Sequence, residues 1–205
     1  MLKLYGYNRS RSTRALWALE ECEADYEYAH VDFGSGEARQ PPFLEINPAG
    51  KVPVLVHDDL VLTESAAICT YIGSLFPERH FVPDPHSPAR AIYDQWCFFV
   101  IGELEQPLWT MGKHRFAIPR KWRGPGILET AAWEFKVALK TLTTKLGDRQ
   151  YLLGDRFSFA DLLVAHTLSW ARNFDIPLPD SDLEDYADRI LDRPAAQRAL
   201  AKEKP

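Results

Sequence analysis

The sequence contains little cysteine and no recognisable set of metal ligands. Its three cysteines, Cys22, Cys69 and Cys97, are odd in number and far apart, so they predict neither a disulfide framework nor a Cys-x-x-Cys pair. This usage favours a reducing, cytoplasmic location. The six histidines include no pair spaced four residues apart and no Cys/His ligand spacing, and no glycine-rich phosphate loop is present. We therefore expect no metal site.

Long apolar runs and an excess of positive charge are also missing. No apolar run approaches the ~20 residues needed to cross a bilayer, and residues 1–5 alternate like a strand rather than a signal peptide. We expect no membrane partner. The 24 Lys and Arg against 29 Asp and Glu give a net charge of -5, which would repel a phosphate backbone and disfavours general nucleic-acid binding. The 46% hydrophobic and 26% charged residues indicate an ordinary globular protein.

The first 76 residues alternate between strand and helix patterns. The segment after the first strand, Tyr7 to Thr13, is a polar turn in which Ser12 or Thr13 is a good helix cap. Residues 34–42 are predicted to be a loop, because Pro41 and Pro42 prevent a regular strand ladder there. Strands are expected at residues 2–5, 26–33, 52–56 and 60–62, and helices at residues 15–22 and 65–76. The order is βαβ followed by ββα, which predicts an α/β domain over residues 1–76.

The remainder of the chain is predicted to be helical. Four prolines between Pro77 and Pro88 indicate a linker at residues 77–86, followed by an all-helical domain at residues 87–205. Its first helix is expected to start at the Ser87 cap and to run to about Met111. A second helix is expected over residues 127–146. The sequence Ser158-Phe159-Ala160-Asp161 predicts a capping box at the start of a third, buried helix.

A proline within an apolar, β-branched run is the first feature that suggests a binding site. Pro53 lies between Val52 and Val54, where proline removes a donor from the strand ladder. A cis Val52-Pro53 bond at the start of a strand would explain this position and would leave the backbone of Val52 ready to pair with an extended peptide ligand. An edge-strand proline after a loop is the alternative interpretation.

Two predicted helix N-termini carry further polar groups. At Thr63-Glu64-Ser65, exposed N–H groups and the Ser65 hydroxyl suit a carboxylate, and Glu64 suits an ammonium group, as at the free end of an amino acid. At residues 8–14, hydroxyls and arginines at a helix N-terminus favour an anion, including a thiolate. Both segments are also explained by ordinary helix capping and solvated charge.

Taken together, these segments resemble those of the cytosolic glutathione transferases. The resemblance rests on NPAGKVPVL, LTESAAICTYI and LLGDRFSFADLLVA, and it covers essentially the whole chain. The loop after the first strand carries Ser10-Arg11-Ser12-Thr13 in place of the Cys-x-x-Cys of the family's thioredoxin relatives, so the chain is similar to the serine-type classes (theta-, beta- or zeta-like). The resemblance implies a thioredoxin-like N-terminal domain, an all-helical C-terminal domain, glutathione as co-substrate without a metal, and a homodimer.

The resemblance also implies which residues hold glutathione. Val52, before the family's cis-proline position at Pro53, would pair through its backbone with the cysteinyl part. Glu64 and Ser65 would hold the γ-glutamyl amino and carboxylate groups. Lys51 and, as a weaker candidate, Gln40 would lie near the glycyl carboxylate, and Arg11 would add positive charge beside the thiolate.

A loop serine is expected to donate its hydroxyl to the glutathione sulfur. Counting back from Arg14, which is similar to an arginine in the first helix of those classes, places this serine at Ser10, with Ser12 as the alternative donor. Tyr5 or Tyr7 would serve in the tyrosine-type classes. Lowering the pKa of a thiol by two units from about 8.5 needs roughly 3 kcal/mol, which one charge-assisted hydrogen bond and the helix dipole can supply.

The electrophile is expected beside the sulfur, against the first long helix of the second domain. Trp109 and Met111 would form an apolar wall there. Five cations without an acid between Gly112 and Gly126 would attract an anionic substrate or form a solvated loop. The candidate residues for the electrophile site are Glu103, Gln106, Trp109 and His114.

These residues predict an enzyme that conjugates glutathione to small hydrophobic electrophiles. Two alternatives stay open, because fold resemblance alone does not decide between them. One is a glutathione-dependent isomerase or peroxidase. The other is a non-catalytic glutathione-binding domain.

Overall fold

The structure is a computed structural model that describes residues 1–179 and 181–203. Its internal contacts divide the chain into two compact units, one formed by residues 1–82 with the C-terminal segment from Asp192, and the other by residues 83–191. This division differs from the expected linker and domain boundaries at the C-terminal end, because the last helix packs on the first one.

The first unit is built on a mixed sheet with the strand order β2-β1-β3-β4. β1 is parallel to β2, and the β1–β3 and β3–β4 pairs are antiparallel. Leu2 and Leu4 of β1 are buried on one face, and Tyr5 lies on the other, as the alternating sequence predicted. The strands are β1 (Leu2–Gly6), β2 (Tyr26–His30), β3 (Val54–His57) and β4 (Leu60–Leu62).

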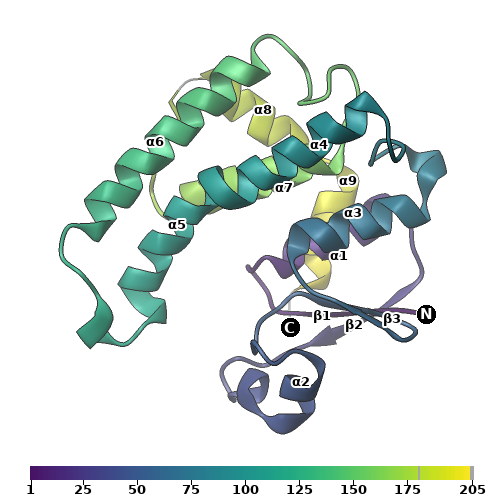
Figure 1. Cartoon of the computed structure of the whole chain (residues 1–205), viewed down its shortest axis with the longest axis vertical. Helices are drawn as coiled ribbons and strands as arrows, with labels where there is room; N and C mark the ends of the chain where they lie inside the picture. The colour runs from purple at the N-terminus through teal and green to yellow at the C-terminus, as the bar shows by residue number, and fades with distance from the viewer. Residues whose placement is uncertain (180, 204–205) are drawn as a thin grey trace. The chain divides into compact units, whose positions relative to one another are not determined.

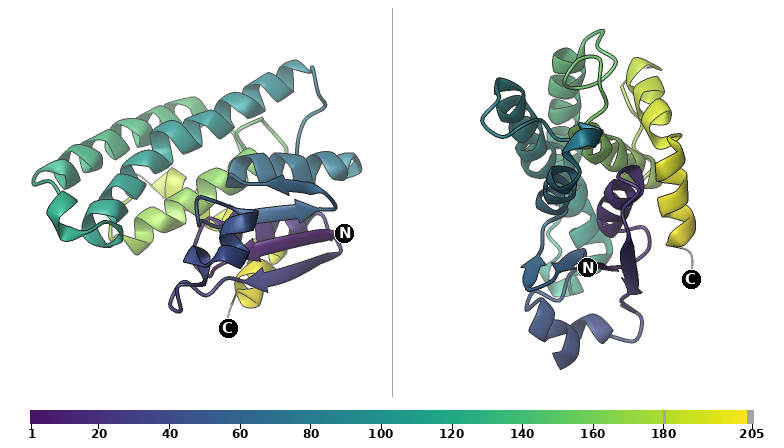
Figure 2. Two further views of the ribbon diagram at one scale, coloured as in Figure 1. Left: turned by 60° about the horizontal axis from the view of Figure 1, so that its bottom comes forward. Right: turned by 90° about the vertical axis from the view of Figure 1, so that its right-hand side faces the viewer.

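Helices cover both faces of this sheet. α1 (Ser12–Glu21) and α3 (Ser65–Leu75) lie on one face, and the short α2 (Pro41–Ile46) lies on the other (Figure 1). α9 (Pro194–Lys202) runs beside α1 (Figure 2). Short 3-10 turns occur at Glu37–Arg39 and Pro77–Arg79.

The loop expected over residues 34–42 is partly helical. Pro41 and Pro42 occupy the first turn of α2, where the missing proline N–H groups would have had no partner within the helix. The prolines therefore exclude a strand, as expected, but they also start a helix. α2 brings Phe43 onto Tyr5 and Val54 in an apolar cluster on its face of the sheet.

The second unit is helical throughout its regular structure. Its first helix begins as expected, since the Ser87 hydroxyl accepts a hydrogen bond from the Arg90 N–H at 3.1 Å and Pro88 follows as the first helical residue. Its elements are α4 (Pro88–Phe99), the π-helical turn η3 (Val100–Leu104), α5 (Glu105–Gly112), the π-helical turn η4 (Lys113–Ala117), the 3-10 turn η5 (Arg120–Trp122), α6 (Ile127–Leu146), α7 (Phe159–Asn173) and α8 (Ser181–Leu191).

The single helix expected from residue 88 to about Met111 is interrupted by a wider turn. Val100–Leu104 is π-helical, and the Glu105 N–H bonds to the carbonyl of Val100. Pro107 of α5 has no N–H for the carbonyl of Glu103, and its ring crowds that carbonyl. We attribute the wider turn to this proline, since such turns accommodate a break in the regular hydrogen-bond ladder.

The capping box expected at the start of α7 is present. The fully buried Asp161 carboxylate accepts hydrogen bonds from the Ser158 N–H at 2.9 Å and the Ser158 hydroxyl at 2.8 Å. It also accepts from the Leu152 N–H and from the Tyr186 hydroxyl. Burial raises the pKa of Asp161, and these donors oppose that shift.

Across residues 1–179 and 181–203, no helix is both long and apolar enough to cross a membrane. The same residues contain no group of three or more side chains placed to hold a metal ion.

Candidate functional site

The sheet register brings the three polar segments of the first unit to one edge. Tyr5 of β1 pairs with Val54 of the antiparallel β3, so the end of β1 lies beside the start of β3. Leu55 pairs with Leu62, so the end of β4 lies at the same edge. Three segments therefore converge there: the serine loop after β1 (residues 7–13), the proline segment before β3 (residues 52–53) and the N-terminus of α3 after β4 (residues 63–65).

Pro53 precedes an inner strand rather than an edge strand. β3 lies between β1 and β4, so the edge-strand interpretation is wrong, and the Val52-Pro53 bond is cis. Pro53 is buried and Val52 is half-buried. Asn47 shapes the preceding loop, because its side-chain amide donates to the Lys51 carbonyl at 2.7 Å and its side-chain oxygen accepts from the Ala49 N–H. The Lys51 side chain is exposed.

Glu64 and Ser65 form the junction between β4 and α3. Glu64 is exposed and has a φ of 66°, a conformation rare for a residue with a side chain. Ser65, the first residue of α3, is 3% exposed, and its hydroxyl accepts a hydrogen bond from the Arg14 guanidinium at 3.2 Å. Because Arg14 donates to that oxygen, the hydroxyl hydrogen of Ser65 remains able to donate to an acceptor.

The two candidate serines differ in burial. Ser12 is fully buried, and its oxygen accepts from the Tyr7 N–H at 3.2 Å and from the Ser10 hydroxyl at 2.9 Å. Ser10 is half-buried, its oxygen accepts from the Ser12 N–H, and its hydroxyl also lies 2.7 Å from the Tyr7 carbonyl. The expectation that Ser12 or Thr13 is the N-cap was wrong: Arg11 holds that position.

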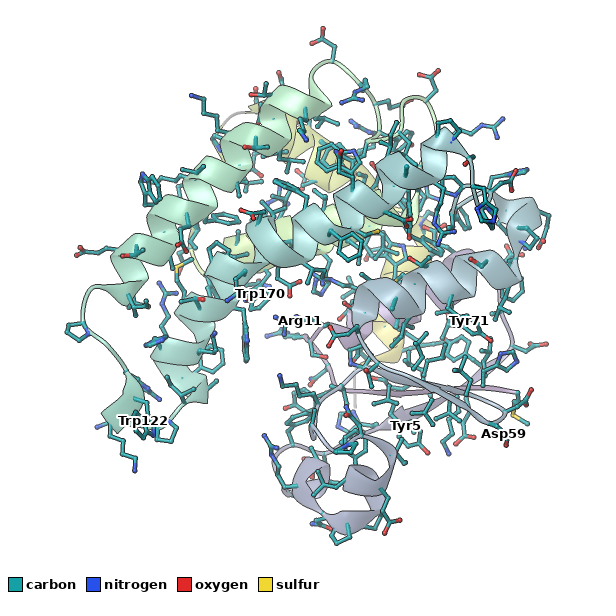
Figure 3. All side chains as sticks on the ribbon, in the orientation of Figure 1. Tyr5, Arg11, Asp59, Tyr71, Trp122 and Trp170 are labelled. Atoms are coloured by element: carbon teal, nitrogen blue, oxygen red, sulfur yellow. The ribbon has the colours of Figure 1, made fainter. Side chains whose placement is uncertain are left out.

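The tyrosines near the loop belong to apolar and aromatic clusters. Tyr5 lies on the α2 face of the sheet (Figure 3) and packs edge-on against Phe43, with ring centroids 6.1 Å apart. The ring of Tyr7 lies 5.1 Å from that of Phe33 and 5.4 Å from that of His30. Each ring is therefore held by neighbours other than the serine loop.

The remaining candidates of the first unit lie at helix N-termini. Arg11 stands at the start of α1 (Figure 3) and is half-buried. Gln40 is exposed and occupies the extended N-cap position of α2. Neither side chain caps its helix.

Sequence reasoning missed two buried charged residues that support this edge of the sheet. Arg14 was considered as a solvated charge, but it is fully buried and contacts Ser65. Its position within the apolar stripe of α1, next to Ala15 and Leu16, is the signal that could have revealed this. Glu203 accepts from the Thr13 hydroxyl and the Arg9 N–H, 190 and 194 residues away in the chain. No sequence spacing indicates such a contact.

The candidate residues for the electrophile site belong to the second unit. Glu103 and Gln106 are exposed, and the Gln106 amide donates to the Thr110 hydroxyl at 3.3 Å. Trp109 packs against Trp170 of α7, with ring centroids 6.4 Å apart. His114 accepts a hydrogen bond from the Gly124 N–H, so one ring nitrogen shapes the loop after α5.

Two further observations limit this assignment. Met111, expected beside Trp109 as an apolar wall, is 2% exposed and belongs to the helical core. A pocket of about 590 Å³ lies between the end of α6 and the start of α8, where Asp148, Asp182 and Arg189 line it. None of the predicted site residues lines this pocket, so we assign it no part in the chemistry.

Comparisons with known proteins match both parts of the chain to one family. Residues 1–74 match the glutathione S-transferase N-terminal domain, and residues 116–194 match the glutathione S-transferase C-terminal domain. Glutathione S-transferase U21 of Arabidopsis thaliana is 32% identical over 197 residues, which cover 91% of this chain and 83% of that protein.

Two solved structures are similar over nearly the whole chain. BphK, a bacterial GST solved as a ternary complex, has a TM-score of 0.89 and 30% identity, covering 99% of this chain and 100% of that one. A sphingomonad glutathione S-transferase complexed with glutathione has a TM-score of 0.85 and 30% identity, covering 98% of each chain. The chain therefore belongs to the glutathione S-transferase family and is an enzyme of that family.

Proposed function

We propose that this enzyme binds glutathione at the edge where the three segments converge, and that Ser10 activates its thiol for conjugation to small hydrophobic electrophiles. The observation that carries the proposal is the contrast between the two serines. Ser12 is buried and accepts two hydrogen bonds, whereas Ser10 is half-buried at the same edge as Val52 and Ser65. A structure of a similar protein with glutathione bound supports the choice of ligand.

Each part of glutathione has a proposed partner. The backbone of Val52, before the cis bond to Pro53, pairs with the cysteinyl part. Ser65 holds the γ-glutamyl carboxylate with its N–H and hydroxyl, while Arg14 fixes the Ser65 oxygen, and Glu64 pairs with the ammonium group. The exposed side chains of Lys51 and Gln40 serve the glycyl carboxylate, and Arg11 adds positive charge beside the sulfur.

Ser10 acts as a hydrogen-bond donor, not as a nucleophile. Its single hydroxyl hydrogen turns from Tyr7 or Ser12 towards the sulfur, while the Ser12 N–H continues to donate to the Ser10 oxygen and polarises it. The glutathione thiol gives its proton to solvent. The thiolate then attacks the electrophilic carbon, and the leaving group departs with its bonding pair.

The electrophile and the assembly are also proposals. We propose that the electrophile binds beside four residues of the second unit, and that these residues set the substrate range: Glu103, Gln106, Trp109 and His114. We further propose a cytoplasmic homodimer with no nucleic-acid or membrane partner. Along the sequence we propose domains at residues 1–76 and 87–205 joined by residues 77–86, with α9, the last helix of the second, packed on α1 within the first compact unit. The exposed side chains of Phe98 on α4 and Trp133 on α6, 79% and 65% exposed, support the dimer.

The test is a pH titration of the ultraviolet thiolate band of glutathione bound to the protein. We expect the wild type to lower the thiol pKa by about two units, which corresponds to roughly 3 kcal/mol. Ser10→Ala should return the pKa most of the way to its free value and reduce kcat, whereas Ser35→Ala, in an exposed loop, should change neither.

Three outcomes would contradict parts of this proposal. An unchanged pKa in Ser10→Ala, with a raised pKa in Ser12→Ala, would transfer the role to Ser12. Binding without a lowered pKa would favour a non-catalytic glutathione-binding domain. A lowered pKa without conjugation of any electrophile, but with turnover of isomerase or peroxidase substrates, would favour those reactions.

A further inference from the structure

The C-terminal helix α9 packs on α1, the helix that follows the serine loop. Two ion pairs join the α9 segment to buried acids of α1. Arg193, just before α9, contacts Glu21 with two nitrogens at 2.5 and 2.7 Å. Arg198 contacts Glu20 at 2.8 Å. A bidentate pair fixes direction as well as distance. These pairs join the start and middle of the α9 segment to the last turn of α1, and the contact of Glu203 with Thr13 places the residue after α9 at the first turn.

Glu203, just after α9, reaches both sides of the serine loop. It is 3% exposed. One carboxylate oxygen accepts from the Thr13 hydroxyl at 2.8 Å, and the other accepts from the Arg9 N–H at 3.3 Å. Arg9 immediately precedes Ser10, and Thr13 lies in the first turn of α1. The two contacts therefore bracket the segment that carries the Ser10 hydroxyl.

The loop conformation requires such support. Arg9 has a φ of 50°, a left-handed conformation that is unfavourable for a residue with a side chain. Such conformations persist where the surrounding structure holds them in place. The hydrogen bond from the Arg9 N–H to the Glu203 carboxylate helps to hold this conformation. The next residue, Ser10, adds hydrogen bonds to the Tyr7 carbonyl and the Ser12 hydroxyl.

A carboxylate is well suited to this position. It offers two acceptor oxygens, so it can serve an amide and a hydroxyl at once. It also lies at the N-terminal end of α1, where the helix dipole favours negative charge. Burial raises the pKa of Glu203, and the Thr13 and Arg9 contacts oppose that rise.

We propose that Glu203 is a positioning residue for thiol activation, which fixes the Ser10 loop through the Arg9 amide and the Thr13 hydroxyl. It does not touch glutathione. The inference rests on the proposed role of Ser10. It assigns part of the catalytic geometry to a residue at the far end of the chain.

The test compares three variants of the full chain by the pKa of bound glutathione, the glutathione Kd and kcat. Glu203→Ala should raise the thiol pKa by at least one unit and lower kcat about tenfold, with Kd changed less than threefold. Glu203→Gln should remain within about twofold of the wild type, because its amide oxygen accepts from Arg9 and its amide nitrogen donates to Thr13. Thr13→Val keeps the Arg9 contact and should give an intermediate effect.

A matched control separates positioning from stability. Arg198→Ala removes one ion pair of α9 but leaves the Arg193–Glu21 pair and the Glu203 contacts in place, so it should lower the unfolding midpoint and leave the bound-thiol pKa unchanged. If Glu203→Ala does not fold, Thr13→Val and Glu203→Gln provide the same comparison. A wild-type pKa and kcat in a folded Glu203→Ala or in Thr13→Val would overturn the inference, as would a pKa raised equally by Arg198→Ala.

The experiment also distinguishes failure of the inference from failure of the proposed function. When Ser10→Ala raises the thiol pKa and Glu203→Ala does not, Ser10 activation stands and the role of Glu203 falls. When Ser10→Ala itself leaves the pKa unchanged, both fall together.

Discussion

At the scale of single residues, Gly6 at the end of β1 packs closely against Tyr28 and the start of α1. A Cβ added there would lie 2.7 Å from a ring carbon of Tyr28 and 2.9 Å from Cβ of Ser12. Both distances are too short for real contacts, so an added Cβ requires Tyr28 and the first turn of α1 both to move, or the strand itself to shift. Glycine therefore allows the strand to end directly beneath the loop that carries Ser10.

We predict that Gly6→Ala destabilises the protein by about 1–3 kcal/mol, the usual cost of overpacking. It should also raise the thiol pKa of bound glutathione, because a shift of Ser12 disturbs the hydrogen bond between the Ser10 and Ser12 hydroxyls. Denaturant unfolding and the thiolate titration measure the two effects. Gly124→Ala is the control, since an added Cβ meets nothing within 4 Å there. Equal stability of the two variants would contradict the close approach.

Glu20 is the residue whose charge most clearly contributes to folding. Hydrogen bonds from Lys202, Tyr26 and Arg198 outweigh the opposing effect of burial and lower the pKa of Glu20 to about 2. Because the folded pKa is below the unfolded value of about 4.5, this contribution is present above pH 4.5 and is lost as the pH falls towards 2.

We predict that the difference in unfolding free energy between wild type and Glu20→Gln shrinks as the pH falls from 5 to 2. The shift corresponds to at most about 3 kcal/mol, reduced by solvent screening because Arg198 and Lys202 are half-exposed. Urea unfolding at several pH values measures it. Glu45→Gln, at an exposed carboxylate, should show no such trend. A pH-independent difference for Glu20→Gln would refute the charge contribution.

At the scale of elements, the start of α7 depends on one carboxylate. A lost helix cap alone costs about 1 kcal/mol. Asp161, however, also accepts from the Leu152 N–H and the Tyr186 hydroxyl, which are buried and lie 9 and 25 residues away in the chain. The structure therefore makes this side chain a junction between α7, α8 and the segment before α7.

We predict that Asp161→Ala costs about 3 kcal/mol or more, because several buried donors lose their acceptor together. Chemical denaturation measures the change. The bound-thiol pKa should stay at the wild-type value at temperatures where the variant is folded. Asp155→Ala, at an exposed carboxylate, should stay within about 0.5 kcal/mol of wild type. A cost for Asp161→Ala near 1 kcal/mol would mean that only the cap matters.

At the scale of the whole molecule, the exposed apolar side chains of α4 and α6 predict self-association. We expect the protein to sediment at twice its chain mass of 23.4 kDa. Phe98→Asp should shift it towards the monomer, because a charge cannot be buried unpaired in an interface. Trp122→Ser, at an exposed residue of the α5–α6 connection (Figure 3), should not. Sedimentation equilibrium distinguishes the two, and a monomeric wild type would contradict the expectation.

The sequence by itself determined the four strands with the two longer helices of the first unit, the Ser87 cap and the capping box of α7, and it left the cis Val52-Pro53 bond as one of two interpretations. These features depend on residues close together in the chain, where periodicity, proline and capping act locally. The same local logic was wrong at Pro41-Pro42, which start a helix, and at Ser12, which is not the N-cap.

Only the tertiary structure decided which polar residues support the site. The register of β1, β3 and β4 joins segments that lie far apart in the chain, and packing buries Arg14 against Ser65. Burial, not spacing, distinguishes Ser10 from Ser12. Glu203 reaches Thr13 across 190 residues because α9 packs on α1. Such contacts are set by the packing of complete elements, so no short stretch of sequence encodes them.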